Sequence, residues 1–112
     1  MTYETFVAEL SAAFPEMTFL EPDLPHVSMG QLVVLLQGAR STPERFNETA
    51  ERALAFIERA GLSDDDRVVN VVAVSFLESL HNLGPHCREI ANRLGPGGRR
   101  ARKQVSGEIC PS

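Results

Sequence analysis

Glu78 and His81 are three residues apart in a segment with helical periodicity, so one face of a helix is expected to carry both side chains. Di-iron helical bundles use such a pair twice, with two further glutamates, whereas this chain contains Glu-x-x-His once. His86 or Cys87 could add a third ligand for a metal-dependent enzyme, the alternative we favour least. We prefer to read His81 as interacting with the last helical turn and Cys87 as a small buried apolar group, and we predict no metal and no cofactor.

A catalytic nucleophile is not predicted either. His86 and Cys87 are neighbours, and neighbouring side chains on a helix point about 100° apart. His26 could act as a general base, but we interpret it as a solvated histidine in an acidic loop. The stretch 95–98 lacks the Lys and Ser or Thr of a phosphate-binding loop. We therefore expect a protein without enzymatic activity.

The acidic residues offer a surface for a basic partner. Residues 1–94 contain 14 acidic and 7 basic side chains, a net charge of −7, and an acidic surface attracts basic proteins. The residues that we assign to partner binding form two clusters in the sequence: Glu16, Glu21 and Asp23, and Asp64, Asp65 and Asp66. Helix capping and solubility explain the same acids equally well, and that alternative stays open.

The C-terminal residues differ from the rest in charge and composition. Residues 95–112 carry four basic side chains and one acid, and they begin with the glycine-rich stretch 95–98. We predict one helical domain over residues 1–96 and a basic, solvated tail over 97–112 that is dispensable for folding. Nucleic acid binding is not expected from so few cations on an acidic body. Because Cys110 falls in this tail, a disulfide framework with Cys87 is not expected.

Start and stop signals predict five helices. Three of them follow a hydroxyl N-cap and end before a glycine that tolerates positive φ. The N-caps are Ser28, Ser41 and Ser63, and the glycines are Gly38, Gly61 and Gly84. Two more helices are expected over residues 2–14 and 85–94, the latter with a proline in its first turn.

The segment from Arg67 to Leu80 is expected to be the central, most buried helix. Its apolar residues at positions 68, 72, 76 and 80 step by four. The runs at 32–36 and 68–74 are rich in β-branched residues, so short buried strands are an alternative for both. We prefer helices because the four-residue step continues past the valines.

The overall composition limits the class of protein. The chain has 112 residues, 43% of them apolar, and a formal charge of −4, as expected for one globular domain. The longest apolar run has five residues, where a bilayer span needs about 20. The first ten residues lack the basic and apolar regions of a secretory signal. We expect a cytoplasmic protein without a membrane span.

Two resemblances add to these patterns. The unit over residues 41–81, a helix, a short turn and a second helix, resembles a single HEAT-type helical hairpin. Over residues 1–96 the chain is similar to a family of small uncharacterised all-helical bacterial proteins, some of them apparently related to toxin-immunity proteins. The segments that carry this second resemblance are Phe14-Pro15-Glu16, Leu24-Pro25-His26-Val27 with Met29-Gly30, Phe56-Ile57-Glu58, Val69-Asn70, Ser75-Phe76-Leu77-Glu78-Ser79-Leu80 and Leu94-Gly95-Pro96.

Together these observations predict an all-α protein, either a five-helix bundle or a HEAT-like array of helical hairpins. Its expected function is to bind a protein partner through an acidic or helix-edge surface. The resemblance implies that this partner is a basic bacterial toxin that the protein neutralises. A small adaptor or assembly subunit is the alternative in the same class.

Overall fold

The computed structural model describes residues 1–18 and 20–110, and all regular secondary structure in them is helical. The helices are α1 (Phe6–Ala13), α2 (Pro25–Ala39), α3 (Pro43–Gly61), α4 (Asp66–Val71), α5 (His86–Ala91) and α6 (Pro96–Arg102). Between α4 and α5 the helix continues as a π-helical turn, η1 (Val72–Phe76), and a 3₁₀ segment, η2 (Leu77–Leu83). The all-α prediction is confirmed. None of the helices described is both long and apolar enough to cross a bilayer.

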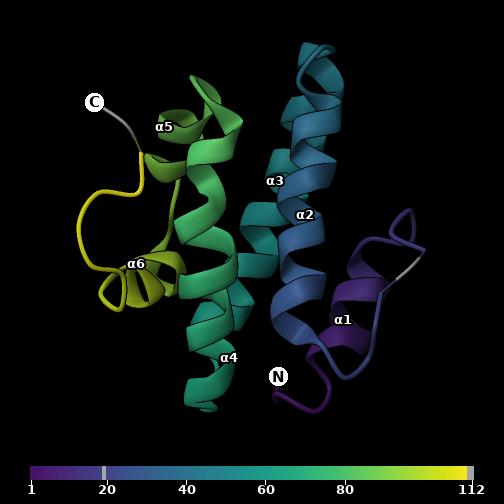
Figure 1. Ribbon diagram of the computed structural model, residues 1–112, viewed down its shortest axis with the longest axis vertical. Coiled ribbons are helices and arrows are strands. Elements are labelled where there is room, and N and C mark those ends of the chain that lie inside the picture. Colours follow the sequence, from purple (N-terminus) through teal and green to yellow (C-terminus); the bar gives the residue numbers. More distant parts are fainter. Residues whose placement is uncertain (19, 111–112) are drawn as a thin grey trace.

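The helices form a slab of 33 × 31 × 19 Å (Figure 1). In its front layer α2 lies beside the continuous helix α4–η1–η2, and both begin at the lower end of the view. Behind them α3 runs in the opposite direction, so that it ends where α4 begins. Large side chains from each of these helices, such as Leu36, Phe56 and Phe76, are completely buried between the layers.

The valine-rich runs are helical, as preferred. Val68, Val72, Phe76 and Leu80 are all 0% exposed, which fits the expectation of a central helix. The π-helical turn was not expected. In this turn the backbone hydrogen bonds span five residues rather than four, so one extra residue is inserted into the helix. The neighbouring residues Phe76 and Leu77 are both fully buried at this point.

Two of the three predicted N-caps, Ser28 and Ser63, do not cap the helices that the structure shows. α2 begins at Pro25, so Ser28 lies inside it and donates a hydrogen bond to the backbone oxygen of Glu21 (3.3 Å). α4 is capped by Asp65, whose carboxylate accepts from the amide of Arg67 (3.0 Å). Ser63 instead accepts from the amide of Asp65 (3.0 Å) in the preceding turn.

The third N-cap and two of the three glycines also differ from the prediction. α3 follows Thr42 rather than Ser41, with Pro43 in its first turn. Gly84 has a φ of 59° at the end of η2, as expected. Gly38 lies within α2 and Gly61 is the last residue of α3, and neither has a positive φ. These two glycines therefore do not end their helices in the left-handed conformation that was predicted for them.

Residues 97–110 differ from the solvated tail that was expected. They include most of α6, which packs against α3, and Ala101 is completely buried. Arg100 donates to the backbone oxygens of Gly61 (3.0 Å) and Ser63 (2.7 Å) at the end of α3. The chain therefore continues as part of the globule after residue 96. Pro111 and Ser112 lie outside the described residues.

The glycine-rich stretch is a packing surface between two helices. The carboxylate of Glu58 accepts hydrogen bonds from the amides of Gly97 (2.9 Å) and Gly98 (3.4 Å). A Cβ atom on Gly97 would overlap the backbone oxygen of Glu58, and one on Gly61 would overlap the carbonyl of Gly97. The absence of side chains lets the two helices touch, so these glycines are required by close approach and form no linker.

Cys87 and Cys110 form a disulfide, contrary to the expectation, with their Cα atoms 5.7 Å apart. Ile109, the residue before Cys110, is only 9% exposed. Ala101, Val105 and Ile109 step by four, and all three belong to or pack against the core. This weak apolar periodicity is the sequence signal that could have predicted that the segment packs against the helical domain.

Candidate protein-binding surface

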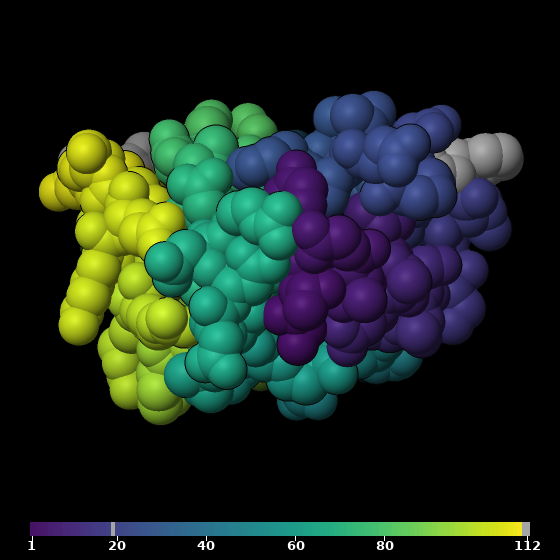
Figure 2. Space-filling model, turned by 90° about the horizontal axis from the view of Figure 1, so that it is seen from below, coloured from purple at the N-terminus to yellow at the C-terminus, as the bar shows by residue number. Residues whose placement is uncertain are grey.

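Five of the six predicted binding residues lie near the starts of two helices that begin at the same end of the molecule, which we call the acidic end. It is the end at which α2 and α4 begin, the lower end in Figure 1. Glu21 and Asp23 directly precede α2, and Asp64, Asp65 and Asp66 lie at the start of α4. In Figure 2, which views this end, the N-terminal residues lie between the segment around α4 and the segment leading into α2.

Glu16 belongs to a different part of the structure. Both of its carboxylate oxygens accept hydrogen bonds from the guanidinium of Arg52 on α3 (2.7 and 2.8 Å). This hydrogen-bonded pair lowers the pKa of Glu16 to about 2. Arg52 also donates to the backbone oxygen of Ala13 (2.9 Å) and lies over the ring of Phe14 (4.7 Å). Glu16 therefore fixes the turn after α1 to α3.

Asp65 is also used inside the structure. In addition to capping α4 it accepts hydrogen bonds from the guanidinium of Arg67 (2.9 Å) and from the amide of Tyr3 (2.9 Å). The bonds from Arg67 and Tyr3 lower the pKa of Asp65 to about 2. Arg67 also pairs with Glu4 (2.9 Å) and lies over the ring of Tyr3 (4.9 Å). Asp65 therefore attaches the N-terminal residues to α4.

The remaining four acids are accessible. Glu21, Asp23 and Asp64 are exposed, and none of them forms an ion pair with any residue that the structure describes. The side chain of Asp66 is 91% exposed and lies 4.0 Å from the guanidinium of Arg100. An exposed ion pair of that length contributes little. The charge of these four carboxylates is available to a partner.

Large apolar side chains are exposed at the same end. Leu24 is 47% exposed at the start of α2, Val27 is 54% exposed one turn later, and Leu62 is 54% exposed at the end of α3. Protein interfaces combine apolar anchors with a charged rim, and single exposed apolar residues without such a setting are common. The sequence alone did not point to these residues, because each of them is a single apolar residue between polar, proline or glycine neighbours.

A hollow of about 610 Å³ adjoins the acidic end, with Tyr3, Asp66, Arg67 and His26 in its lining. His26 is half-buried in the first turn of α2, and its Nδ1 lies 2.6 Å from the hydroxyl of Ser75 on η1. The prediction that His26 is a solvated histidine in a loop is therefore wrong. The hydrogen bond between the two side chains links α2 to the central helix.

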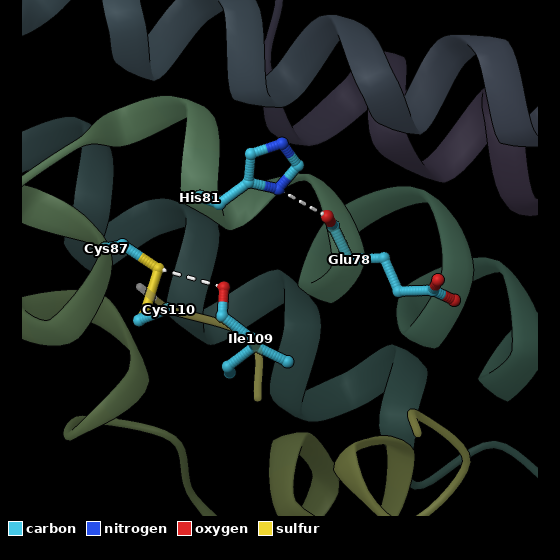
Figure 3. The surroundings of a disulfide bond; sticks show 5 residues. All are labelled: Glu78, His81, Cys87, Ile109 and Cys110. Carbon is cyan, nitrogen blue, oxygen red and sulfur yellow. Dashed lines mark hydrogen bonds between the residues drawn. A yellow bond between two sulfur atoms is a disulfide. The ribbon is translucent and has the colours of Figure 1, made fainter. Parts of the chain in front are cut away.

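The structure does not bring the proposed metal ligands Glu78, His81 and His86 together into a site. The Nδ1 of His81 lies 2.8 Å from the backbone oxygen of Glu78, whose carboxylate points away from the imidazole (Figure 3). His86 is paired with Glu89 (3.0 Å) and stacks against Phe46 (4.4 Å). Among the residues described, no three His, Cys, Asp or Glu side chains are grouped so that they could hold an ion.

One protein-family model matches the chain, over residues 7–107, and it is described as a domain of unknown function, DUF7674. The matched range includes α6 and most of the segment after it. No curated protein matches the chain, and no solved structure does.

Proposed function

The chain belongs to the DUF7674 family, and we propose that it is a non-enzymatic domain that binds a basic protein through the acidic end. One observation carries this proposal. Four exposed carboxylates, of Glu21, Asp23, Asp64 and Asp66, share one end of the molecule with three large exposed apolar side chains.

The two kinds of side chain would act at different steps of binding. Long-range attraction by the carboxylates raises the rate at which a basic partner arrives in a productive orientation. The apolar side chains, once covered by the partner, slow its dissociation because they leave water. Leu24, Val27 and Leu62 are the candidates for this second role.

We further propose, from the resemblance over residues 1–96, that the partner is a basic bacterial toxin. Neutralisation would require only that the bound domain cover the toxin's functional surface. No catalytic residue is needed for that role, which is consistent with a surface of carboxylates and apolar side chains.

The test compares charge reversals at the acidic end with reversals elsewhere. The two test variants are Glu21→Lys with Asp23→Lys, and Asp64→Lys with Asp66→Lys. Asp65 is left unchanged because its loss would disturb the N-terminus. The control is Glu48→Lys with Glu51→Lys, which makes the same change of charge on exposed positions of α3.

A basic protein that co-purifies with the wild-type domain provides the partner for kinetic measurements. We expect at least one test variant to lose about tenfold in association rate while the control changes little, and raising salt from about 0.05 to 0.5 M to slow association. Val27→Ser should mainly accelerate dissociation. Wild-type association of both test variants, together with rates that do not depend on salt, would refute binding through the acidic end.

A further inference from the structure

The stretch of residues 103–110 lies against η2 and α5, where the disulfide attaches it (Figure 3). One hollow beside the stretch is lined by Glu78 and His81 of η2, and a second by Arg88 and Ala91 of α5. Residues 108–110 border both hollows. The stretch therefore separates two surfaces that would form one continuous surface without it.

Few non-covalent contacts hold the stretch on this surface. It contains no helix, and its backbone oxygens at Val105 and Gly107 accept hydrogen bonds from Arg102 of α6 (3.1 and 2.7 Å), not from η2 or α5. Ile109, at 9% exposed, is the most buried apolar side chain of the stretch, and Val105 and Cys110 are only partly buried against the core. Ordering the backbone of eight residues costs about 8–16 kcal/mol of conformational entropy, more than the burial of one isoleucine and part of Val105 and Cys110 offsets.

We propose that the Cys87–Cys110 disulfide is a redox-controlled latch that holds residues 103–110 on η2 and α5 and releases them when it is reduced. This proposal does not depend on the proposed function. It rests on the placement of the two cysteines, one in the body and one at the end of a stretch that has no other strong attachment.

The reductant required is a dithiol. Cys87 is 0% exposed whereas Cys110 is partly exposed, so a thiolate of the reductant reaches the sulfur of Cys110. Its attack breaks the S–S bond, forms a mixed disulfide with Cys110 and releases Cys87 as a thiolate, which takes up a proton. The second thiol of the reductant then displaces Cys110, so two electrons pass to the protein and the dithiol leaves as its own disulfide.

Opening stops at α6, because α6 has its own attachments. The carboxylate of Glu58 accepts hydrogen bonds from the amides of Gly97 and Gly98, and Arg100 donates to the end of α3.

The sulfur of Cys87 lies 3.3 Å from the backbone oxygen of Ile109, so that the reduced thiol has an acceptor only while the stretch stays in place. In a cytoplasm rich in thiols the latch would be open, and in an oxidising compartment closed.

The test measures trypsin cleavage of the full chain after Lys103, with cleavage after Arg99 in α6 as the internal control. Oxidised wild-type protein is compared with protein in dithiothreitol and with Cys110→Ser, which cannot close the latch and needs no reductant. Thiol titration in denaturant should find no free thiol before reduction and two after it. We expect reduction and Cys110→Ser each to accelerate cleavage after Lys103 at least tenfold, with cleavage after Arg99 unchanged.

The remaining outcomes overturn the proposal. Two free thiols in protein purified without reductant under air would mean that the bond does not form. Equal cleavage of oxidised protein and Cys110→Ser after Lys103 would mean that other contacts hold the stretch. Equal acceleration after Arg99 would mean that α6 opens too and that the latch is not confined to residues 103–110. Cys87→Ser with Cys110→Ser should show no response to dithiothreitol, which excludes an effect of the reagent on trypsin.

Discussion

Replacing Gly97 by alanine should destabilise the protein, although alanine is the better helix former. The new Cβ would overlap the backbone oxygen of Glu58, and a backbone atom cannot rotate away as a side chain can. α6 must therefore move off α3, which breaks the hydrogen bonds from the amides of Gly97 (2.9 Å) and Gly98 (3.4 Å) to the Glu58 carboxylate.

The size of the effect follows from these contacts. A hydrogen bond to a charged group is worth about 1.5–3 kcal/mol, and the longer of the two is counted as minor. With part of the packing around Ala101 lost as well, we expect Gly97→Ala to lower the free energy of unfolding by about 2–4 kcal/mol. For a domain of this size that corresponds to a fall in thermal midpoint of about 8–16 °C.

Two other glycines provide a graded comparison. A Cβ on Gly30, inside α2, meets no atom within 4 Å, so Gly30→Ala should stabilise the protein by about 0.5–1 kcal/mol. The three atoms nearest to a Cβ on Gly98 all belong to the side chain of Leu94, which can shift, so the effect of Gly98→Ala should lie between the other two.

Thermal and urea unfolding, followed by circular dichroism, give the three differences in stability. We expect the order Gly30→Ala, Gly98→Ala, Gly97→Ala, from most to least stable. A Gly97→Ala protein as stable as the wild type or more so would show that α6 does not pack on α3 through this contact. The solvated tail would then be the better description.

Three further predictions concern the tail, the core and acid stability. Truncation after Gly98 should lower the thermal midpoint by at least about 5 °C, because it removes Ala101 and the hydrogen bonds of Arg100; an unchanged midpoint would contradict the packing of α6. Phe76→Asp should give insoluble or unfolded protein, since it buries a carboxylate at a position with no exposure; native-like solubility and circular dichroism would contradict a central helix. Glu16 has a folded pKa of about 2 against an ordinary 4.5, so its pair with Arg52 stabilises the protein above pH 4.5 and the stabilisation is lost as pH falls towards 2. Glu16→Gln should lose less stability than the wild type over that window in acid unfolding, and equal losses would refute a structural role for the pair.

The binding residues illustrate how far the sequence alone could lead. Their negative charge could be read directly, and so could their grouping along the chain. Whether a carboxylate is free depends on which hydrogen-bond donors the fold brings to it: the guanidinium of Arg52 is 36 residues from Glu16, and the amide of Tyr3 is 62 residues from Asp65. Charge is a property of the residue, but availability of that charge is a property of the fold.

The sequence by itself determined that the protein is all-α and which segment forms its centre. Apolar residues recur with the helical period, and this local pattern needs no knowledge of distant contacts. Only the tertiary structure decided the role of residues 95–110. In the sequence, a glycine that allows two helices to touch cannot be distinguished from a glycine in a flexible linker. The difference lies in Glu58 and Cys87, which reach Gly97 and Cys110 only after the chain has folded.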